Sequence, residues 1–165
     1  MRHVVVALVL AFGVACAASP GSAPSPRAAA GPTVPVLKVT DGDTIHVRYQ
    51  GEDERVRFIG VDTPEVSWYG GEAECYGAEA RTYARGRLGG KTVRLEFDVD
   101  RRDRYGRLLA YVYVGTELFN LTLVREGYAT ADPVPPDTRL GATFEQAEGA
   151  ARAAGKGLWS ACDRM

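Results

Sequence analysis

The sequence has little net charge, few cysteines and no long hydrophobic run. Its 20 lysines and arginines are balanced by 21 aspartates and glutamates, so the 165 residues carry a formal charge of -1. Overall charge therefore gives no argument for a nucleic-acid partner, and such an argument must come from local groups of charges. With 45% hydrophobic and 25% charged residues, the composition indicates one compact domain. It excludes a disordered tail and a multidomain assembly.

No acidic residue precedes Asp41. The segment Met1–Ala18 has a basic start, an apolar run and small residues at its end, which is typical of a bacterial export signal. The apolar run Val4–Val14 is shorter than the roughly 20 residues that a membrane-spanning helix needs. Cleavage after Ala17 and lipidation of Cys16 both fit this pattern. We therefore expect a secreted or extracytoplasmic protein, whose only membrane contact would be a lipid on Cys16.

Residues 19–35 are rich in Ala, Pro, Ser and Gly, a composition that favours an extended tether over a core. We expect one domain over residues 36–165, without internal repeats. The cysteine count of three is odd, so at least one cysteine lies outside any intramolecular disulfide. With Cys16 in the leader, Cys75 and Cys162 form an even pair that an oxidising compartment allows to bond. The alternative is two unpaired buried thiols.

Alternating polar and apolar residues begin near Val36 and predict strands that are buried on one face. Thr44–Tyr49 and Glu54–Val61, separated by a glycine-containing interruption, are expected to form a hairpin. A third alternating run covers residues 93–97. Leu108–Val114 is apolar on both faces, which predicts a central strand.

Helical spacing of apolar residues predicts three helices among these strands. The first covers Tyr76–Leu88 and stops at a Gly-Gly pair, and the second, residues 120–126, ends before Gly127. Thr143, with a glutamine three residues later, resembles a capping box before a helix that runs to about Ala154. About five strands with few helices indicate an α+β fold, mainly β, in which helices pack against a closed or partly open barrel.

Two acidic motifs stand at the ends of the predicted hairpin arms, Asp41–Thr44 and Val61–Glu65. Because hairpin arms return to neighbouring positions, Asp43 and Asp62 are expected to lie close together. Two such carboxylates repel each other unless a cation lies between them, and a hard ion such as Ca²⁺ or Mg²⁺ suits oxygen ligands. Taken alone, the first motif also fits an ordinary turn.

The neighbours of Asp62 add two further candidate groups. Pro64 disfavours the helical conformation at Thr63, which leaves the Thr63 carbonyl available to a metal. Glu65 can face the same cavity and orient or deprotonate a metal-bound water, although it also fits a solvated loop residue. An EF-hand is excluded, because Ile45 and His46 occupy positions where that loop needs a ligand and a glycine.

Arginines occur near the same strand ends. Arg57 lies on the polar face of the second hairpin arm, and Arg107 begins the predicted central strand. Guanidinium binds phosphate through two parallel hydrogen bonds, and neighbouring arginines add positive charge at Arg101, Arg102 and Arg104. The alternatives are a solvated loop and a cross-strand pair of Arg57 with a carboxylate. Together, a metal site, side chains that bind phosphate and a group that activates water are the components needed for phosphodiester hydrolysis.

From about Val36 to Trp159, the chain resembles the staphylococcal nuclease (thermonuclease) family. The matching motifs, in order, are Asp41–Thr44, Arg57 with Val61–Glu65, Tyr76–Ala80, Asp103–Arg107 with Leu109–Val112, Leu123–Gly127 and Gly157–Trp159. One motif would be weak, but all of them in order with compatible spacing are highly specific. The resemblance implies an OB-fold five-stranded barrel with about three helices packed against it. It also implies calcium-dependent, sugar-nonspecific hydrolysis of DNA and RNA to 3′-phosphate products.

The resemblance also implies roles for individual residues. The catalytic positions would be Arg57, Glu65 and Arg107. The arginines would bind phosphate and stabilise its developing charge, and Glu65 would act as general base or water organiser. The Ca²⁺ ligands would be Asp43, Asp62 and the carbonyl of Thr63. Residues that support the metal or contact the nucleotide would be Asp41, Arg104 and Tyr105.

The sequence departs from the family in two places. The two tyrosines that flank the nucleotide base in its best-known member fall at Pro133 and Pro135. Base stacking contributes about 1–3 kcal/mol per base, so substrate affinity or base preference is expected to differ. That member also lacks cysteine, so the pairing of Cys75 with Cys162 follows only from cysteine count and compartment.

Two rival functions remain besides an exported nuclease that acts on DNA and RNA as a monomer. A non-catalytic OB-type module would use the same barrel to bind nucleic acid or a peptide. A structural Ca²⁺ site in an envelope protein would explain Asp43 and Asp62 but would leave Arg57 and Arg107 without a role. The presence of all the catalytic positions favours the hydrolase, which needs no protein partner.

Overall fold

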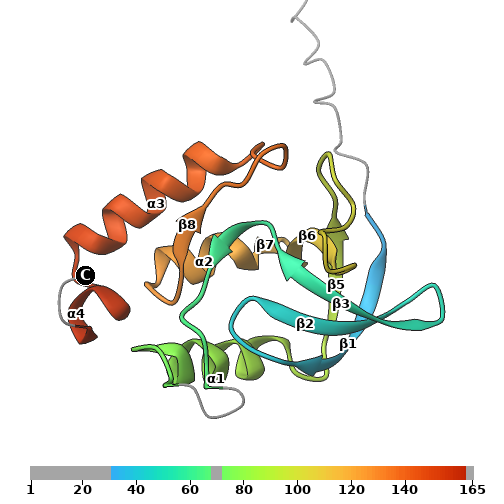
Figure 1. The fold of residues 1–165 in the computed structure, drawn as a ribbon, viewed down its shortest axis with the longest axis horizontal. Coiled ribbons are helices and arrows are strands. Elements are labelled where there is room, and N and C mark those ends of the chain that lie inside the picture. Colours follow the sequence, from blue (N-terminus) through green and yellow to red (C-terminus); the bar gives the residue numbers. More distant parts are fainter. Residues whose placement is uncertain (1–30, 68–71, 163–165) are drawn as a thin grey trace, which may run out of the picture.

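The computed structural model describes residues 31–67 and 72–162 (Figure 1). The predicted export signal, the possible lipid site at Cys16 and residues 19–30 of the predicted tether lie outside the described residues. Within residues 31–67 and 72–162, no helix is both long enough and apolar enough to cross a bilayer.

Five strands form a closed mixed barrel, which confirms the α+β, OB-type expectation. They are β1 (Thr33–Val39), β2 (Thr44–Tyr49), β3 (Glu52–Phe58), β5 (Thr92–Glu96) and β6 (Leu108–Val114). Antiparallel pairs give the order β3-β2-β1-β5-β6, and a parallel pairing of β3 with β6 closes the barrel. The short strand β7 (Glu117–Leu118) pairs antiparallel with the end of β6. β1 begins at Thr33, earlier than the alternating pattern near Val36 indicates.

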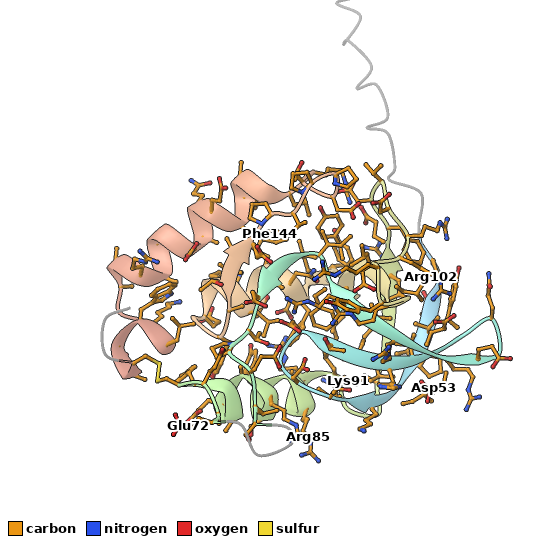
Figure 2. The ribbon with its side chains drawn as sticks, in the orientation of Figure 1. Asp53, Glu72, Arg85, Lys91, Arg102 and Phe144 are labelled. Atoms are coloured by element: carbon orange, nitrogen blue, oxygen red, sulfur yellow. A yellow bond between two sulfur atoms is a disulfide. The ribbon has the colours of Figure 1, made fainter. Side chains whose placement is uncertain are left out.

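The predicted second hairpin arm is divided into two strands. β3 ends at Phe58, and β4 (Gly60–Asp62) pairs instead with β8 (Thr130–Asp132) in a separate two-stranded sheet. Gly60 has a φ of 77°, and a Cβ there would lie 2.5 Å from the ring of Phe144. Glycine therefore allows the chain to leave the barrel directly beneath α3, whose Phe144 is labelled in Figure 2. A continuous arm to Val61 was the wrong prediction.

In the part of the chain that the structure describes, four helices surround the barrel and the two-stranded sheet. They are α1 (Gly77–Leu88), α2 (Phe119–Arg125), α3 (Gly141–Ala153) and α4 (Leu158–Ala161). The first three confirm the predicted helices, while α4 was not predicted. In Figure 1, α1 lies beneath the barrel, and α3 lies on the opposite side of the molecule. The capping box at Thr143 was wrong: the N–H groups of Thr143 and Phe144 both donate to the Leu140 carbonyl, so Thr143 is already in the first turn.

The core lies inside the barrel and extends under α2 and α3. β6 is its central strand, as predicted, and four of its residues are buried: Leu108, Ala110, Tyr111 and Val112. The ring of Phe119 on α2 meets the ring of Phe58 edge-on, with centroids 6.1 Å apart. A disulfide joins Cys75 to Cys162, which confirms the predicted pairing and excludes unpaired thiols (Figure 2). It links the segment before α1 to the end of α4.

Asn120 on α2 holds three buried backbone groups together. Its Oδ1 accepts a hydrogen bond from Val112 N (2.8 Å), and its Nδ2 donates to the carbonyls of Ile59 (2.9 Å) and Ala110 (3.4 Å). We expect Asn120→Leu to lower the free energy of unfolding by about 3 kcal/mol, because each buried group left unpaired costs about 1–3 kcal/mol. Urea denaturation measures this, with Gln146→Leu on the exposed face of α3 as control. Equal effects of the two changes would contradict this account.

Candidate active site

The two acidic motifs meet where β2 begins and β4 ends. Asp43 is buried, and its Oδ2 accepts hydrogen bonds from Thr63 N (2.8 Å) and Thr63 Oγ1 (3.0 Å). Its Oδ1 accepts one from Thr44 Oγ1 (3.1 Å). A Cβ on Gly42 would lie 2.7 Å from the Thr63 side chain, so glycine is needed for this close approach. The Asp43 carboxylate is thus fixed against the 62–65 segment.

Arg57 connects the two aspartates of the predicted metal site. Its Nη1 contacts Asp43 Oδ2, and its Nη2 donates to Asp62 Oδ1 at 2.6 Å. The pairing of β2 with β3 places Thr44 opposite Arg57, which brings the arginine next to Asp43. The expected approach of Asp43 and Asp62 is therefore confirmed, and Arg57 pairs with carboxylates as the alternative interpretation proposed. The side chain of Asp62 is 54% exposed, so this half of the pair remains open to solvent.

Two further carboxylates surround this cluster. Burial raises the pKa of Asp41, and the positive charge of Arg57 opposes this rise without cancelling it. Although the Glu65 residue is exposed as a whole, partial burial of its carboxyl raises the pKa of that group, and the negative charge of Asp41 adds to the effect. Four carboxylates, those of Asp41, Asp43, Asp62 and Glu65, thus share a region in which Arg57 is the nearest cation. Such an excess of negative charge favours a bound cation.

Arg107 lies beside the same cluster, at the start of β6. Its Nε donates to Asp103 Oδ2 at 2.6 Å, and Asp103 Oδ1 accepts from the backbone N–H groups of Arg107 and Tyr105, both at 2.9 Å. Partial burial would raise the pKa of Asp103, but the hydrogen bonds from Arg107 outweigh it and the pKa is lowered. Among the described residues, Asp103 is the one carboxylate paired with Arg107, and it engages Nε. Both terminal nitrogens are thereby left for a ligand.

A cavity of about 540 Å³ opens beside the two arginines. Its lining includes Arg57, Arg107, Arg104, Tyr105, Val134, Pro135 and Pro136. Asp137 Oδ1 accepts a hydrogen bond from Asp100 N (2.9 Å), which ties the proline-rich loop to the arginine-rich loop across the cavity. Tyr105 is 61% exposed at the rim. Of the two prolines that replace tyrosines, Pro135 lines the cavity, while Pro133 packs against Gly141 of α3.

The other predicted arginines are placed differently. Arg102 forms a double hydrogen bond with Glu54, at 2.6 and 2.9 Å, and so braces the loop against β3. The guanidinium of Arg101 stacks on Phe97, and that of Arg104 lies over the Tyr105 ring. Of these three, Arg102 and Arg104 line the cavity, whereas Arg101 lies away from it.

The donor set suits a hard divalent cation. Asp43 and Asp62 could supply carboxylate oxygens, and Thr63, which follows Asp62, has its N–H and hydroxyl bonded to Asp43, so that its carbonyl is the group left for a metal. In residues 31–67 and 72–162, no three acidic, histidine or cysteine side chains are close enough to ligate one ion together. Two carboxylates therefore need carbonyl and water oxygens to complete a shell, which is common for Ca²⁺. On these grounds the residues fit Ca²⁺.

Sequence reasoning missed two residues that hold the candidate catalytic groups. Asp103 orients Arg107, and its signal was local: an Asp that begins a glycine-containing turn accepts backbone N–H groups. Glu74 binds the backbone of Glu65, whose N–H donates to Glu74 Oε2 at 2.9 Å. No local pattern predicts this contact, since the two residues are brought together by the folded loop.

Comparison with known proteins agrees with this geometry. Residues 55–161 match the family described as Staphylococcal nuclease homologue. The chain is 43% identical over 124 residues to a thermonuclease of Staphylococcus intermedius, covering 75% of this chain and 74% of that protein. It is 42% identical over 128 residues to a thermonuclease of Staphylococcus hyicus, covering 78% and 76%. It is 39% identical over 125 residues to endonuclease YncB of Bacillus subtilis (strain 168), covering 74% and 59%.

Proposed function

This chain belongs to the staphylococcal nuclease family, and on that premise we propose that it is a calcium-dependent nuclease that cleaves DNA and RNA to 3′-phosphate products. Its relatives are thermonucleases and endonucleases, so the chain is an enzyme that hydrolyses phosphodiester bonds of nucleic acids. The calcium dependence, the lack of sugar preference and the product end are the parts we propose.

One observation carries the proposal: both arginines line one cavity, and Arg57 also contacts Asp43 and Asp62 of the acidic cluster. The parallel pairing of β3 with β6 places Arg57 next to Leu109, two residues from Arg107. The positive charges of Arg57 and Arg107 both act to lower the pKa of Asp41, against the effect of burial. Both guanidinium groups therefore lie near this carboxyl. A phosphodiester in the cavity would therefore meet two positive groups. Glu65 does not line the cavity, but its carboxyl lies close enough to Arg57 for the arginine's charge to oppose the rise of its pKa.

Each residue has a distinct role in this proposal. Arg57 and Arg107 bind the non-bridging phosphate oxygens and stabilise the negative charge that develops as the water attacks. Glu65 accepts a proton from, or orients, the attacking water. Asp103 holds the guanidinium of Arg107 by its Nε, so that the two terminal nitrogens face the phosphate. The donors of Arg107, held in advance in this way, need no rearrangement during the reaction.

Asp43, Asp62 and the Thr63 carbonyl would hold Ca²⁺, supported by Asp41. When bound, the ion supplies a Lewis acid that polarises the phosphate. In the structure Arg57 contacts the carboxylates of Asp43 and Asp62, and it would give up these contacts when the ion binds. Arg104 and Tyr105, at the cavity rim, are placed to contact the nucleotide. Because Pro133 and Pro135 stand where two stacking tyrosines occur in the family's best-known member, we expect substrate affinity or base preference to differ from that member's.

The disulfide supports export, because such bonds persist in oxidising compartments outside the cytoplasm. We therefore propose an extracytoplasmic location. Lipidation of Cys16 and cleavage after Ala17 stay open, and the mass of the native N-terminus distinguishes them.

End-group analysis tests the proposed reaction. We expect the purified protein, with Ca²⁺, to cut single-stranded DNA and RNA to fragments that carry a 3′-phosphate. A phosphatase that removes this group should shift the fragments in a gel, and an excess of chelator should stop cleavage. Fragments with 5′-phosphate ends, or cleavage that persists in chelator, would contradict the proposal. DNA binding without cleavage would favour the OB-type binding module.

A further inference from the structure

Both backbone polar groups of Glu65 are bonded to Glu74. The Glu65 N–H donates to Glu74 Oε2 at 2.9 Å, and the Glu74 N–H donates to the Glu65 carbonyl at 3.0 Å. Glu65 itself is exposed, so packing against the core does not fix its position. These two hydrogen bonds therefore fix the backbone of Glu65 and, with it, the starting direction of the Glu65 side chain.

Glu74 is in turn held by the first turn of α1. Gly77 N donates to the Glu74 carbonyl at 3.1 Å. A Cβ on Gly77 would lie 2.6 Å from the Glu65 carbonyl oxygen and 2.9 Å from that of Pro64, so only glycine allows the helix to approach this closely. The start of α1 thus packs directly against the backbone of Glu65.

The disulfide attaches this same segment to the C-terminal helix. Cys75 follows Glu74 in the chain and bonds to Cys162 at the end of α4. α4 is anchored to the body of the protein, because the Leu158 side chain is buried and Leu158 N donates to the Gly127 carbonyl at 2.9 Å. Cys75 is exposed, so a reductant in solution can reach the bond. The arrangement joins Glu65, Glu74 and α4 in one continuous chain of contacts.

We propose that Glu74 is a positioning residue for Glu65 and that the Cys75–Cys162 disulfide keeps Glu74 in place, so that turnover depends on this bond. The proposal rests on the catalytic role of Glu65 proposed above. Reduction by a dithiol transfers two electrons and two protons to the cysteines, giving two thiols, while the dithiol becomes a disulfide. The segment that carries Glu74 then loses its covalent link to α4.

Glu74 variants test the positioning role. We expect Glu74→Ala to lower kcat about 10-fold, a loss typical of removing a supporting partner, with KM changed less than about 2-fold. Glu74→Gln keeps an oxygen that can accept from Glu65 N and should restore most of the lost kcat. Glu72→Ala is the control, since Glu72 is an exposed glutamate of the same segment (labelled in Figure 2). Equal losses in the alanine and glutamine variants, or a change confined to KM, would overturn the role of Glu74.

The disulfide is tested with Cys75→Ser/Cys162→Ser. At a temperature where circular dichroism shows both proteins folded, we expect kcat of this variant to fall about 3- to 10-fold with KM unchanged. Dithiothreitol should lower kcat of the wild-type protein equally and leave the variant unaffected. A folded variant with wild-type kcat would overturn the role of the bond. If the variant does not fold, the dithiothreitol experiment on folded wild-type protein decides in the same way.

A Glu65→Ala background separates this proposal from the proposed function. If Glu74 acts through Glu65, adding Glu74→Ala to Glu65→Ala should cause no further loss of kcat. Independent, multiplying losses would overturn the positioning role while leaving Glu65 catalytic. Full kcat in Glu65→Ala alone would instead overturn the role of Glu65 in the proposed function.

Discussion

Arg107→Ala is expected to lower kcat on single-stranded DNA by roughly 10³-fold or more, the cost of removing an arginine that stabilises phosphoryl charge in the transition state. Asp103 holds Arg107 through Nε at 2.6 Å and its backbone N–H at 2.9 Å, so the guanidinium is already oriented before substrate binds. Arg107→Lys keeps the charge but loses the planar pair of donors, and should recover only a small part of the rate. Steady-state kinetics with calcium measure both variants.

Arg152→Ala is the matched control for this prediction. Arg152 pairs with Glu148 on α3, at 3.3 Å, and its side chain is 64% exposed. We expect its replacement to leave kcat and KM unchanged. Should Arg107→Ala remain folded and retain more than about a tenth of wild-type kcat, the assignment of Arg107 to the transition state is wrong.

Asp43→Asn is expected to weaken calcium binding more than it weakens the fold. The asparagine oxygen can still accept from Thr63 N, so the local backbone contact survives. The loss of one carboxylate charge should raise the Ca²⁺ concentration for half-maximal activity by roughly 10- to 100-fold. This is the range found when groups that support a bound metal are removed. Titrating activity with calcium measures this shift, and excess calcium should partly restore the rate.

Asp53→Asn provides the control for the calcium titration. Asp53, labelled in Figure 2, is exposed on β3 and hydrogen-bonds His46 at 2.7 Å, away from the acidic cluster. Its replacement should leave the calcium dependence unchanged. A calcium titration of Asp43→Asn that overlays the wild-type curve would show that Asp43 is not a ligand.

The hairpin explains why much of the site was predictable from sequence. The alternation of polar and apolar residues predicted the two strands of the hairpin. The pairing of Thr44 with Arg57 follows once these strands and the turn between them are recognised. Asp62 lies beyond the break after β3, on β4, and the contacts of Arg57 with both carboxylates bring it near Asp43. The cysteine pair was predictable because two cysteines are left once Cys16 is assigned to the predicted export signal.

Contacts between distant segments account for what was missed. The strand break at Gly60 depends on close contact with the ring of Phe144. Phe144 lies on α3, far from Gly60 in the sequence. The start of α3 depends on the Leu140 carbonyl, which accepts N–H groups without any side-chain cap, so no capping residue marked it. The contact of Glu74 with Glu65 likewise depends on tertiary structure, because exposed loop residues leave no periodic signal.

The most direct test of the central claim compares wild-type protein with Arg57→Ala/Glu65→Gln/Arg107→Ala. The measurement is the rate of cleavage of end-labelled single-stranded DNA in calcium, with circular dichroism to confirm that both proteins are folded. We predict rapid cleavage by the wild-type protein and cleavage indistinguishable from buffer by the triple variant. A folded triple variant that still cleaves, or a wild-type protein that binds the DNA and leaves it intact, would contradict the assignment of nuclease activity to these three residues.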